Sequence, residues 1–226
     1  GGYMNGSRYY GEDLPINTWY MKRFAGLSED GLSLWYYTDK ETNEEKTTTT
    51  YSTGDFYLCG DPNPDLYGGF GTSITFHGFD LSTQFSYLVG GLTYDYGYAG
   101  MMGNPTATSV GNRWHKDVLK AWSPENPSST IPRWHFNDLN TTGSSDRFLI
   151  DGSYLNLQNI QVGYTLPDSW TSHLKIKNLR LYFVCDNVYY WSKRKGLDPR
   201  RSISGVGTSG KIAPFRTYSG GISLQF

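Results

Sequence analysis

The last stretch of the chain, residues 214–226, alternates between apolar and polar positions with a period of two. This period predicts a β-strand, because successive side chains of a strand point to opposite faces. The polar face carries no charge from Thr217 to Phe226. An apolar face beside an uncharged polar face is typical of a transmembrane β-strand, which meets lipid on one side and a polar lumen on the other. The expected membrane-insertion residues are Tyr218, Ile222, Leu224 and Phe226.

Further segments have a two-sided pattern of the same kind. Residues 70–89 predict a hairpin that turns at Gly78, with an apolar face on each strand. Residues 154–165 predict a strand whose first apolar residues are out of phase with the later ones, so a β-bulge is expected near residues 158–159. A less regular strand is predicted at residues 179–189.

The connections between these strands alternate in length. The turn at Gly78 is short, residues 90–151 form a long connection, residues 166–177 a shorter one and residues 190–213 a second long one. An antiparallel outer-membrane barrel with short periplasmic turns and long outer loops has this order. The order also places Phe226 at the periplasmic rim.

The rest of the chain is less regular. Strands are predicted at residues 16–25 and 32–37, on either side of a turn, whereas residues 39–53 read as an exposed polar loop. Within the long connection, a helix is predicted at about residues 113–122. Ser123 and Pro124 mark its end.

Composition fits a β-rich chain with many turns. Of the 226 residues, 37% are hydrophobic and 16% aromatic, and the formal net charge of −1 gives no indication of nucleic-acid binding. No apolar run approaches the ~18 residues of a membrane helix. Cys59 and Cys185 show no metal-ligand spacing, and a disulfide between them stays open on the sequence alone.

Catalytic chemistry has little support in the residues. The four histidines are scattered, and no zinc-binding helix motif occurs. Asp146 and Asp151 flank Arg147, which fits a loop salt bridge or a turn cap better than an acid–base pair. The sequence therefore predicts no catalytic residue, no metal site, no cofactor and no enzyme activity.

Aromatic residues recur through the long connection and are the candidate contact residues. Flat aromatic faces can stack on sugar rings, and they are also enriched where proteins meet partners. The alternative reading is that these side chains pack the loop onto itself. The candidates for contact with a substrate or a lipoprotein partner are Tyr94, Tyr96, Trp114, Trp122 and Trp134.

Seven motifs, in order along the chain, together resemble one family. The chain resembles the C-terminal barrel region of SusC/RagA-type TonB-dependent outer-membrane transporters of Bacteroidetes. The matching stretches are residues 12–15 (EDLP), 63–70 (NPDLYGGF) with 77–82 (HGFDLS), 122–127 (WSPENP) with 131–133 (IPR), 151–159 (DGSYLNLQN), 163–167 (GYTLP), 197–199 (LDP) and 216–218 (RTY). A final Phe226 also resembles the sorting signal of outer-membrane barrels.

The resemblance implies a fold and partners. It implies an antiparallel transmembrane β-barrel of about 22 strands, plugged by an N-terminal domain. It further implies a SusD-like surface lipoprotein over the outer mouth, energy from the TonB complex through an N-terminal region that this chain lacks, and contact with outer-membrane lipid. Import of a glycan or an oligopeptide would follow. A dimeric assembly stays open.

The expected organisation is the C-terminal part of one barrel domain over residues 1–226. Its parts are irregular strands and a loop at 1–69, a hairpin at 70–89, a long extracellular loop at 90–152 and the last three strands at 153–226. At most about six strands fit, too few to close such a barrel, so the chain is expected to be part of a longer protein or one piece of a split barrel.

Two alternative functions remain. The aromatic content fits a secreted β-sandwich that binds carbohydrate. A related barrel could also serve as a scaffold in an outer-membrane assembly or secretion complex.

Overall fold

The computed structural model describes residues 1–107, 111, 113–138, 140–141, 143–194, 196–201, 204–206 and 214–226. The chain divides into two compact units. We call Gly1–Asn63, Gly91–Asp151 and Arg200–Gly210 the core unit, and Pro64–Gly90, Gly152–Pro199 and Lys211–Phe226 the sheet unit. Among the described residues, no helix is both long enough and apolar enough to cross a membrane.

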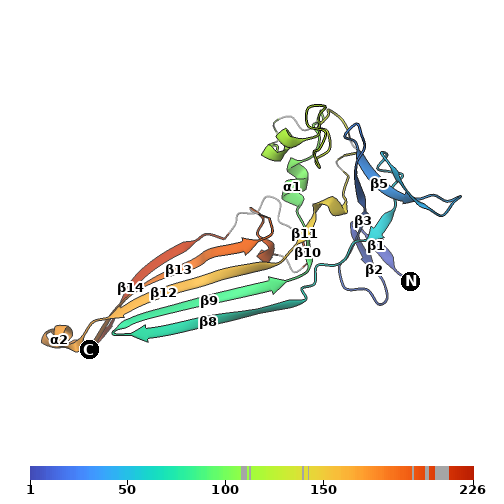
Figure 1. Cartoon of the computed structure of the whole chain (residues 1–226). Coiled ribbons are helices and arrows are strands. Elements are labelled where there is room, and N and C mark those ends of the chain that lie inside the picture. Colours follow the sequence, from blue (N-terminus) through green and yellow to red (C-terminus); the bar gives the residue numbers. More distant parts are fainter. Residues whose placement is uncertain are drawn as a thin grey trace. The chain divides into compact units, whose positions relative to one another are not determined.

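The sheet unit is built on one antiparallel sheet of five strands, in the order β14-β13-β12-β9-β8. Figure 1 shows them as long arrows lying side by side. The strands are β8 (Leu66–Phe76), β9 (Phe79–Val89), β12 (Tyr154–Thr165), β13 (Asn178–Ser192) and β14 (Thr217–Gln225). The predicted all-β antiparallel architecture is therefore confirmed, as an open sheet and not as a closed barrel.

The hairpin of β8 and β9 matches the predicted one and begins four residues earlier, at Leu66. Its two turn residues, His77 and Gly78, have φ values of 46° and 83°. Two consecutive left-handed residues match the right-handed twist of the strands that they join, and glycine adopts such a φ without strain. This sequence therefore supports a two-residue turn.

The predicted bulge in β12 is confirmed by a register shift between Leu157 and Asn159. Leu157 pairs with Phe85 of β9, whereas Asn159 pairs with the next residue back, Gln84. Gln158 is therefore an extra residue relative to β9. It brings the leucines before the shift and the apolar residues after it onto one face of the sheet.

The other connections are longer. Between β12 and β13 the chain forms α2 (Asp168–Thr171) and η3 (Ser172–Leu174). Strand β13 continues to Ser192, so the predicted loop from residue 190 starts later than expected. That loop contains η4 (Pro199–Arg201), and its residues 207–213 lie outside the described part of the chain.

The core unit contains short strands in three sheets, of order β1-β2-β3-β7, β4-β5-β6 and β10-β11. The strands are β1 (Tyr3–Asn5), β2 (Arg8–Tyr10), β3 (Thr18–Lys22), β4 (Phe24–Leu27), β5 (Ser33–Thr38), β6 (Glu45–Thr48), β7 (Phe56–Leu58), β10 (Leu92–Tyr94) and β11 (Leu149–Asp151). The predicted strand at 16–25 is thus divided into β3 and β4, and the one at 32–37 is β5.

Two predictions in this unit were wrong. The polar stretch 39–53 is not a loop throughout, because β6 pairs with β5 along four residues. The predicted helix at 113–122 is only a five-residue 3₁₀ helix, η1 (Lys116–Lys120). The imidazole of His115 accepts the N–H of Asp117 and caps this short turn. Trp114 stays outside it and donates its indole N–H to the carbonyl of Gly103.

Two further short helices were not predicted. They are α1 (Tyr96–Met101) and η2 (Asp146–Phe148). Helix α1 begins where the Asp95 side chain accepts the N–H of Tyr98.

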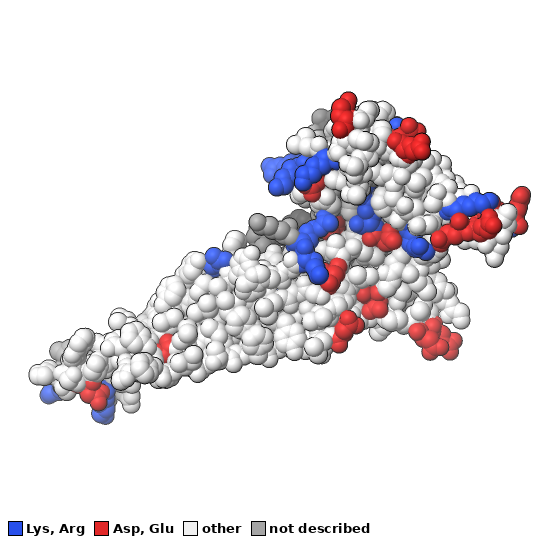
Figure 2. Space-filling view, in the orientation of Figure 1, with Lys and Arg blue, Asp and Glu red and all other residues white. Residues whose placement is uncertain are grey.

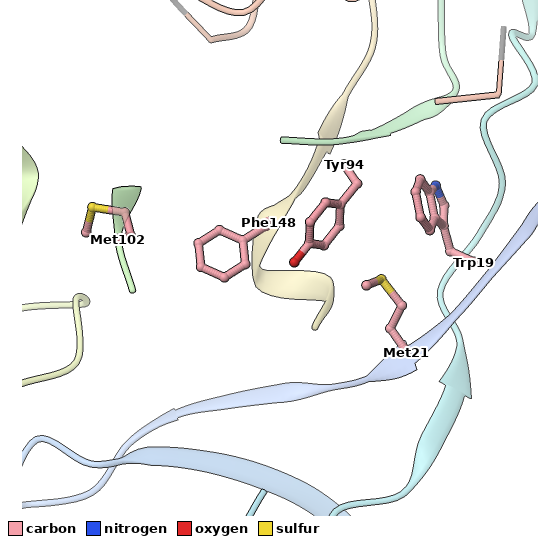
Figure 3. Close-up of a cluster of buried hydrophobic side chains, with 5 residues drawn as sticks. All are labelled: Trp19, Met21, Tyr94, Met102 and Phe148. Carbon is pink, nitrogen blue, oxygen red and sulfur yellow. The ribbon is translucent and has the colours of Figure 1, made fainter. Parts of the chain in front are cut away.

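The hydrophobic core of this unit is a cluster of Trp19, Met21, Tyr94, Met102 and Phe148. Figure 3 shows the Tyr94 ring between Trp19 and Phe148. The ring centroids of Tyr94 lie 5.8 Å from Trp19 and 6.0 Å from Phe148. Strand β3 and the long connection therefore share one core. Both cysteines of the chain, Cys59 and Cys185, are free thiols.

Candidate functional site

One face of the five-stranded sheet is apolar across all of its strands. Residues paired across antiparallel strands point to the same face, so the register defines this surface, which we call the apolar face. The apolar face includes Leu66, Phe70, Ile74 and Phe76 of β8, Phe79, Leu81, Phe85, Tyr87 and Val89 of β9, Leu155, Leu157, Ile160, Val162 and Tyr164 of β12, Leu179, Leu181, Phe183, Cys185, Tyr189 and Trp191 of β13, and Tyr218, Ile222 and Leu224 of β14.

These side chains are not covered by a second layer within the sheet unit. The predicted insertion residues Tyr218, Ile222 and Leu224 are 61%, 65% and 49% exposed, and Phe226 is 74% exposed just beyond β14. A soluble protein rarely exposes so large an apolar surface. The apolar face therefore requires an apolar environment.

Aromatic residues mark both ends of the apolar face. Phe76, Phe79 and Tyr164 lie at the end with the two-residue turn, and Tyr87, Tyr189 and Trp191 lie toward the opposite end. Aromatic girdles at the two lipid–water boundaries bracket the apolar band of an outer-membrane barrel in the same way.

The opposite face, which we call the polar face, carries mostly hydroxyl, amide and charged side chains and glycines, with apolar residues such as Leu88 and Val184 among them. Asn159 donates an amide hydrogen to the Asp186 carboxylate at 2.7 Å, and Asn156 donates to the Ser86 hydroxyl at 3.3 Å. These bonds join neighbouring strands on this face. These four polar side chains therefore have partners within the sheet.

One ion pair on the polar face spans three strands. The Arg180 guanidinium on β13 donates to both Asp80 carboxylate oxygens on β9, at 2.8 and 2.5 Å, and crosses β12 at Gly163. A Cβ atom at Gly163 would overlap both charged groups. Glycine at this position lets the pair form, and the bidentate geometry fixes the two side chains together.

The structure separates the five predicted aromatic contact residues. Tyr94 is 2% exposed in the core, and burial raises the pKa of its phenol to about 12. Trp122 is half-buried, and a Cβ atom at Gly31 would overlap its ring, so the two residues are in close contact. Tyr96 is exposed next to Tyr94, at a ring-centroid distance of 4.4 Å.

Trp114 and Trp134 form an exposed aromatic pair. Their ring centroids lie 5.5 Å apart at an interplanar angle of 84°. Both indole N–H groups donate to the same carbonyl, that of Gly103, at 3.1 and 3.4 Å. The polar atoms of the pair are therefore already bonded, and its exposed surface is apolar.

Asp146 makes a main-chain hydrogen bond, and Arg147 makes ring contacts. The Asp146 carboxylate accepts the backbone N–H of Phe24 at 2.8 Å, and burial raises its pKa. The Arg147 guanidinium lies 5.2 Å from the ring centroids of both Phe24 and Phe148, and burial lowers its pKa to about 10. These contacts hold η2 against β4. Among the described residues, no group of three or more His, Cys, Asp or Glu could hold a metal ion.

Two features were missed from the sequence. Lys22 is 5% exposed, although a lysine at the end of a strand gives no signal of burial. The β12–β13 connection places Trp170, Lys175 and Lys177 at one end of the sheet. A tryptophan followed by two lysines in a connection between membrane strands could have drawn attention to it.

Comparison with known proteins finds similarity to TonB-dependent receptors. No family model matches the chain. It is 29% identical over its whole length to TonB-dependent receptor P3 of Formosa agariphila, and 27% identical over 78% of its length to TonB-dependent receptor SusC of Bacteroides thetaiotaomicron. The chain spans 22% and 17% of these relatives, which is about a fifth of their length.

Solved structures of the RagAB peptide transporter are similar to the whole chain. One matches with a TM-score of 0.82 and 25% identity over 25% of its own chain, and the 'open-open' state matches with 0.79 and 25% over 24%. The resemblance to a part of the SusC/RagA-type transporters is thus confirmed in sequence and in fold. These relatives are receptors and transporters, which agrees with the prediction that the chain is not an enzyme.

Proposed function

We propose that this chain, as part of a SusC/RagA-type TonB-dependent transporter, forms a segment of the barrel through which a glycan or an oligopeptide enters across the bacterial outer membrane. Strands β8, β9, β12, β13 and β14 cross the membrane, with the apolar face toward lipid and the polar face toward the lumen. The observation that carries this proposal is the exposed apolar face, bracketed by aromatic residues.

Strand length supports the proposal. Strands β8 and β9 have 11 residues each. At ~3.3 Å per residue and a tilt of ~45°, such a strand covers roughly 25 Å, the height of the apolar band of these barrels. Periplasmic turns of barrels are short, so the turn at His77 and Gly78 lies in the periplasm, and so does the C-terminal end of β14.

Partners and substrate follow from the relatives. RagAB is described as a peptide transporter, which favours an oligopeptide, whereas a glycan is the substrate class suggested by the SusC resemblance. A SusD-like lipoprotein covers the outer mouth, and the TonB complex supplies energy. Residues 90–152 are extracellular, where Tyr96, Trp114, Trp122 and Trp134 contact the substrate or the lipoprotein.

The secreted β-sandwich alternative is not favoured by the sheet unit. A sandwich buries the apolar face of each sheet against a second sheet about 10 Å away. The described sheet unit contains one sheet, and its apolar face is open.

The test compares two neighbouring positions of β12 in the full-length protein. Val162→Lys places a charge on the apolar face, and Gln161→Lys places the same charge on the polar face. We expect V162K to lower the stability of the inserted barrel by about 2–4 kcal/mol and its amount in the outer membrane, while Q161K behaves like the wild type. Outer-membrane fractionation and heat-modifiable migration measure both. Equal behaviour of the two variants would refute the assignment of the faces.

Substrate class is tested separately by growth. A strain that lacks the gene is supplied with peptides or with oligosaccharides as the limiting nutrient. Loss of growth on one class alone, restored by the wild-type gene, identifies the imported class. Normal growth of the deletion strain on both classes would contradict import of either.

A further inference from the structure

The connection between β12 and β13 is a folded cap and not a tight turn. Helices α2 and η3 follow each other directly, and Thr171, the last residue of α2, is 2% exposed. The chain closes on itself through hydrogen bonds from the N–H of Lys175 to the carbonyl of Ser172 and from the N–H of Ile176 to that of Thr171, at 3.0 and 3.3 Å. The backbone of the cap is therefore closed by its own hydrogen bonds.

This cap lies at the same end of the sheet as the two-residue turn. The N–H of Thr165, the last residue of β12, donates to the carbonyl of Gly78 at 2.7 Å. On the other side, the N–H of Lys177 donates to the carbonyl of Gln225 at 2.8 Å. The cap is thus part of the sheet end where the apolar face stops.

The cap contains a shallow depression of about 450 Å³. It is lined by Asp168, Thr171, Ser172, Lys175, Ile176 and Lys177. Both lysines are exposed, and neither is in an ion pair with a described residue. The two ammonium groups outnumber the single carboxylate of Asp168 in this lining, so the depression has a net positive charge and favours a negatively charged oxygen ligand.

The surroundings of the depression resemble a membrane boundary. Trp170 of α2 is 66% exposed, and tryptophan is enriched at the level of lipid head groups. In Figure 2, blue and red atoms gather at the α2 end of the sheet, whereas most of the sheet surface shown is white. The free ammonium groups therefore lie where an apolar surface ends, which is the level of lipid phosphates.

We propose that this depression binds the phosphate head group of a glycerophospholipid in the periplasmic leaflet. Lys175 and Lys177 pair with the phosphate, and the Ser172 hydroxyl can donate to the same oxygens. The acyl chains then extend along the apolar face. This assignment rests on the proposed membrane insertion, which places the cap on the periplasmic side.

The experiment measures binding of phosphatidylglycerol to the full-length protein in detergent by native mass spectrometry. Each lysine near a lipid phosphate contributes about fivefold in affinity, so K175Q/K177Q is expected to bind about 25-fold more weakly. The matched control K40Q/K116Q removes two exposed lysines of the core unit and should bind like the wild type. Unchanged binding in K175Q/K177Q would overturn the proposal.

A second arm separates a lipid from a soluble phosphate and uses the wild type alone. Glycerol phosphate, which has the head group without acyl chains, should fail to compete at concentrations where the lipid saturates. Equal competition would assign the site to a soluble phosphate and overturn the lipid assignment. Raising the salt concentration should weaken lipid binding, because exposed charges are screened.

Membrane insertion is measured independently, in the strains that express the wild type and K175Q/K177Q. Outer-membrane fractionation of the wild type tests the proposed function without reference to the lysines. A wild type that inserts, with K175Q/K177Q binding lipid as strongly, would refute this site alone. A wild type that is absent from the outer membrane would refute the proposed function as well.

Discussion

Lys22 shows how a buried charge can be held by hydrogen bonds to main-chain oxygen atoms, next to the rings of Tyr51 and Phe56. Its ammonium group donates to the carbonyls of Tyr51, Ser52 and Gly54, at 2.7, 3.2 and 2.6 Å. All three hydrogens of the group are thus directed at one loop. Burial lowers the pKa of this lysine, and the three bonds compensate part of the cost of removing the charge from water.

Replacing Lys22 should therefore destabilise the core unit. Lys22→Met keeps the length of the side chain and leaves three carbonyls without their donor, at a cost of on the order of 3 kcal/mol. Chemical unfolding of the full-length protein measures the effect. Protease cleavage within residues 50–54 serves as the readout of unfolding. The control Lys40→Met lies on the surface and should change stability by less than about 0.5 kcal/mol. Equal stability of both variants would show that the carbonyls find other donors.

Cys59 is a thiol whose surroundings suppress its ionisation. Its sulfur lies 3.3 Å from the carbonyl oxygen of Tyr57, and burial, followed by the charge of Asp146, raises the thiol pKa to about 11. The ordinary value is 9.0. Only the thiolate reacts with alkylating reagents, so the fold should protect this side chain.

We expect Cys59 to react with iodoacetamide at about pH 7.5 about 100-fold more slowly in the folded protein than in the unfolded chain, because two pKa units correspond to a hundredfold lower thiolate fraction well below both pKa values. Because the folded pKa lies above the unfolded one, the associated stability is present below about pH 9 and is lost as the pH rises through 11. Mass spectrometry of the peptide that contains Cys59 gives the rate. A folded rate equal to the unfolded one would show that the thiolate is not suppressed.

At the scale of elements, the ion pair between Arg180 and Asp80 links β13 to β9 across β12. Arg180 and Asp80 are on strands that do not pair with each other, and they meet because Gly163 between them has no side chain. Glycine is needed at this position because a side chain would occupy the space of the ion pair, and not because of its conformational freedom.

Gly163→Ala should therefore break this ion pair. The added methyl group overlaps both charged side chains, which we expect to cost about 1–3 kcal/mol in the stability of the barrel. Gly220→Ala on β14 is the matched control, since its Cβ atom would meet its nearest neighbour, the carbonyl oxygen of Tyr182, at 3.9 Å. Thermal loss of heat-modifiable migration compares the two variants. Similar melting temperatures would mean that Arg180 and Asp80 can shift at no cost.

At the scale of the whole molecule, the sheet was predictable because its two faces differ in polarity. Ile222 and Leu224 alternate with Ser223 and Gln225, so both strand and face could be read from the sequence. Strand β6 could not be predicted from the sequence, because Glu45–Thr48 has no apolar residue. Its pairing with β5 makes it a strand. Local pattern identifies elements with a buried face, and tertiary pairing decides the rest.

The contact residues were harder to judge for a related reason. Tyr94 and Tyr96 have the same side chain, two positions apart, yet one is in the core and the other is exposed. Their sequence context does not distinguish them, since the core of this unit is assembled from segments far apart in the chain, such as Trp19 and Phe148. Burial of this kind appears only after the fold is known.

The extra residue in β12 also determines where this strand can change its length. Leu155 and Leu157 lie before Gln158, and Ile160 lies after it, all on one side. Loss of Gln158 would leave a regular alternation against β9, whereas loss of a residue away from this bulge would turn one half of the strand over. Loss of the neighbouring Asn159 has the same effect, so gaps within β12 are expected at Gln158 or Asn159 among natural variants of this sequence.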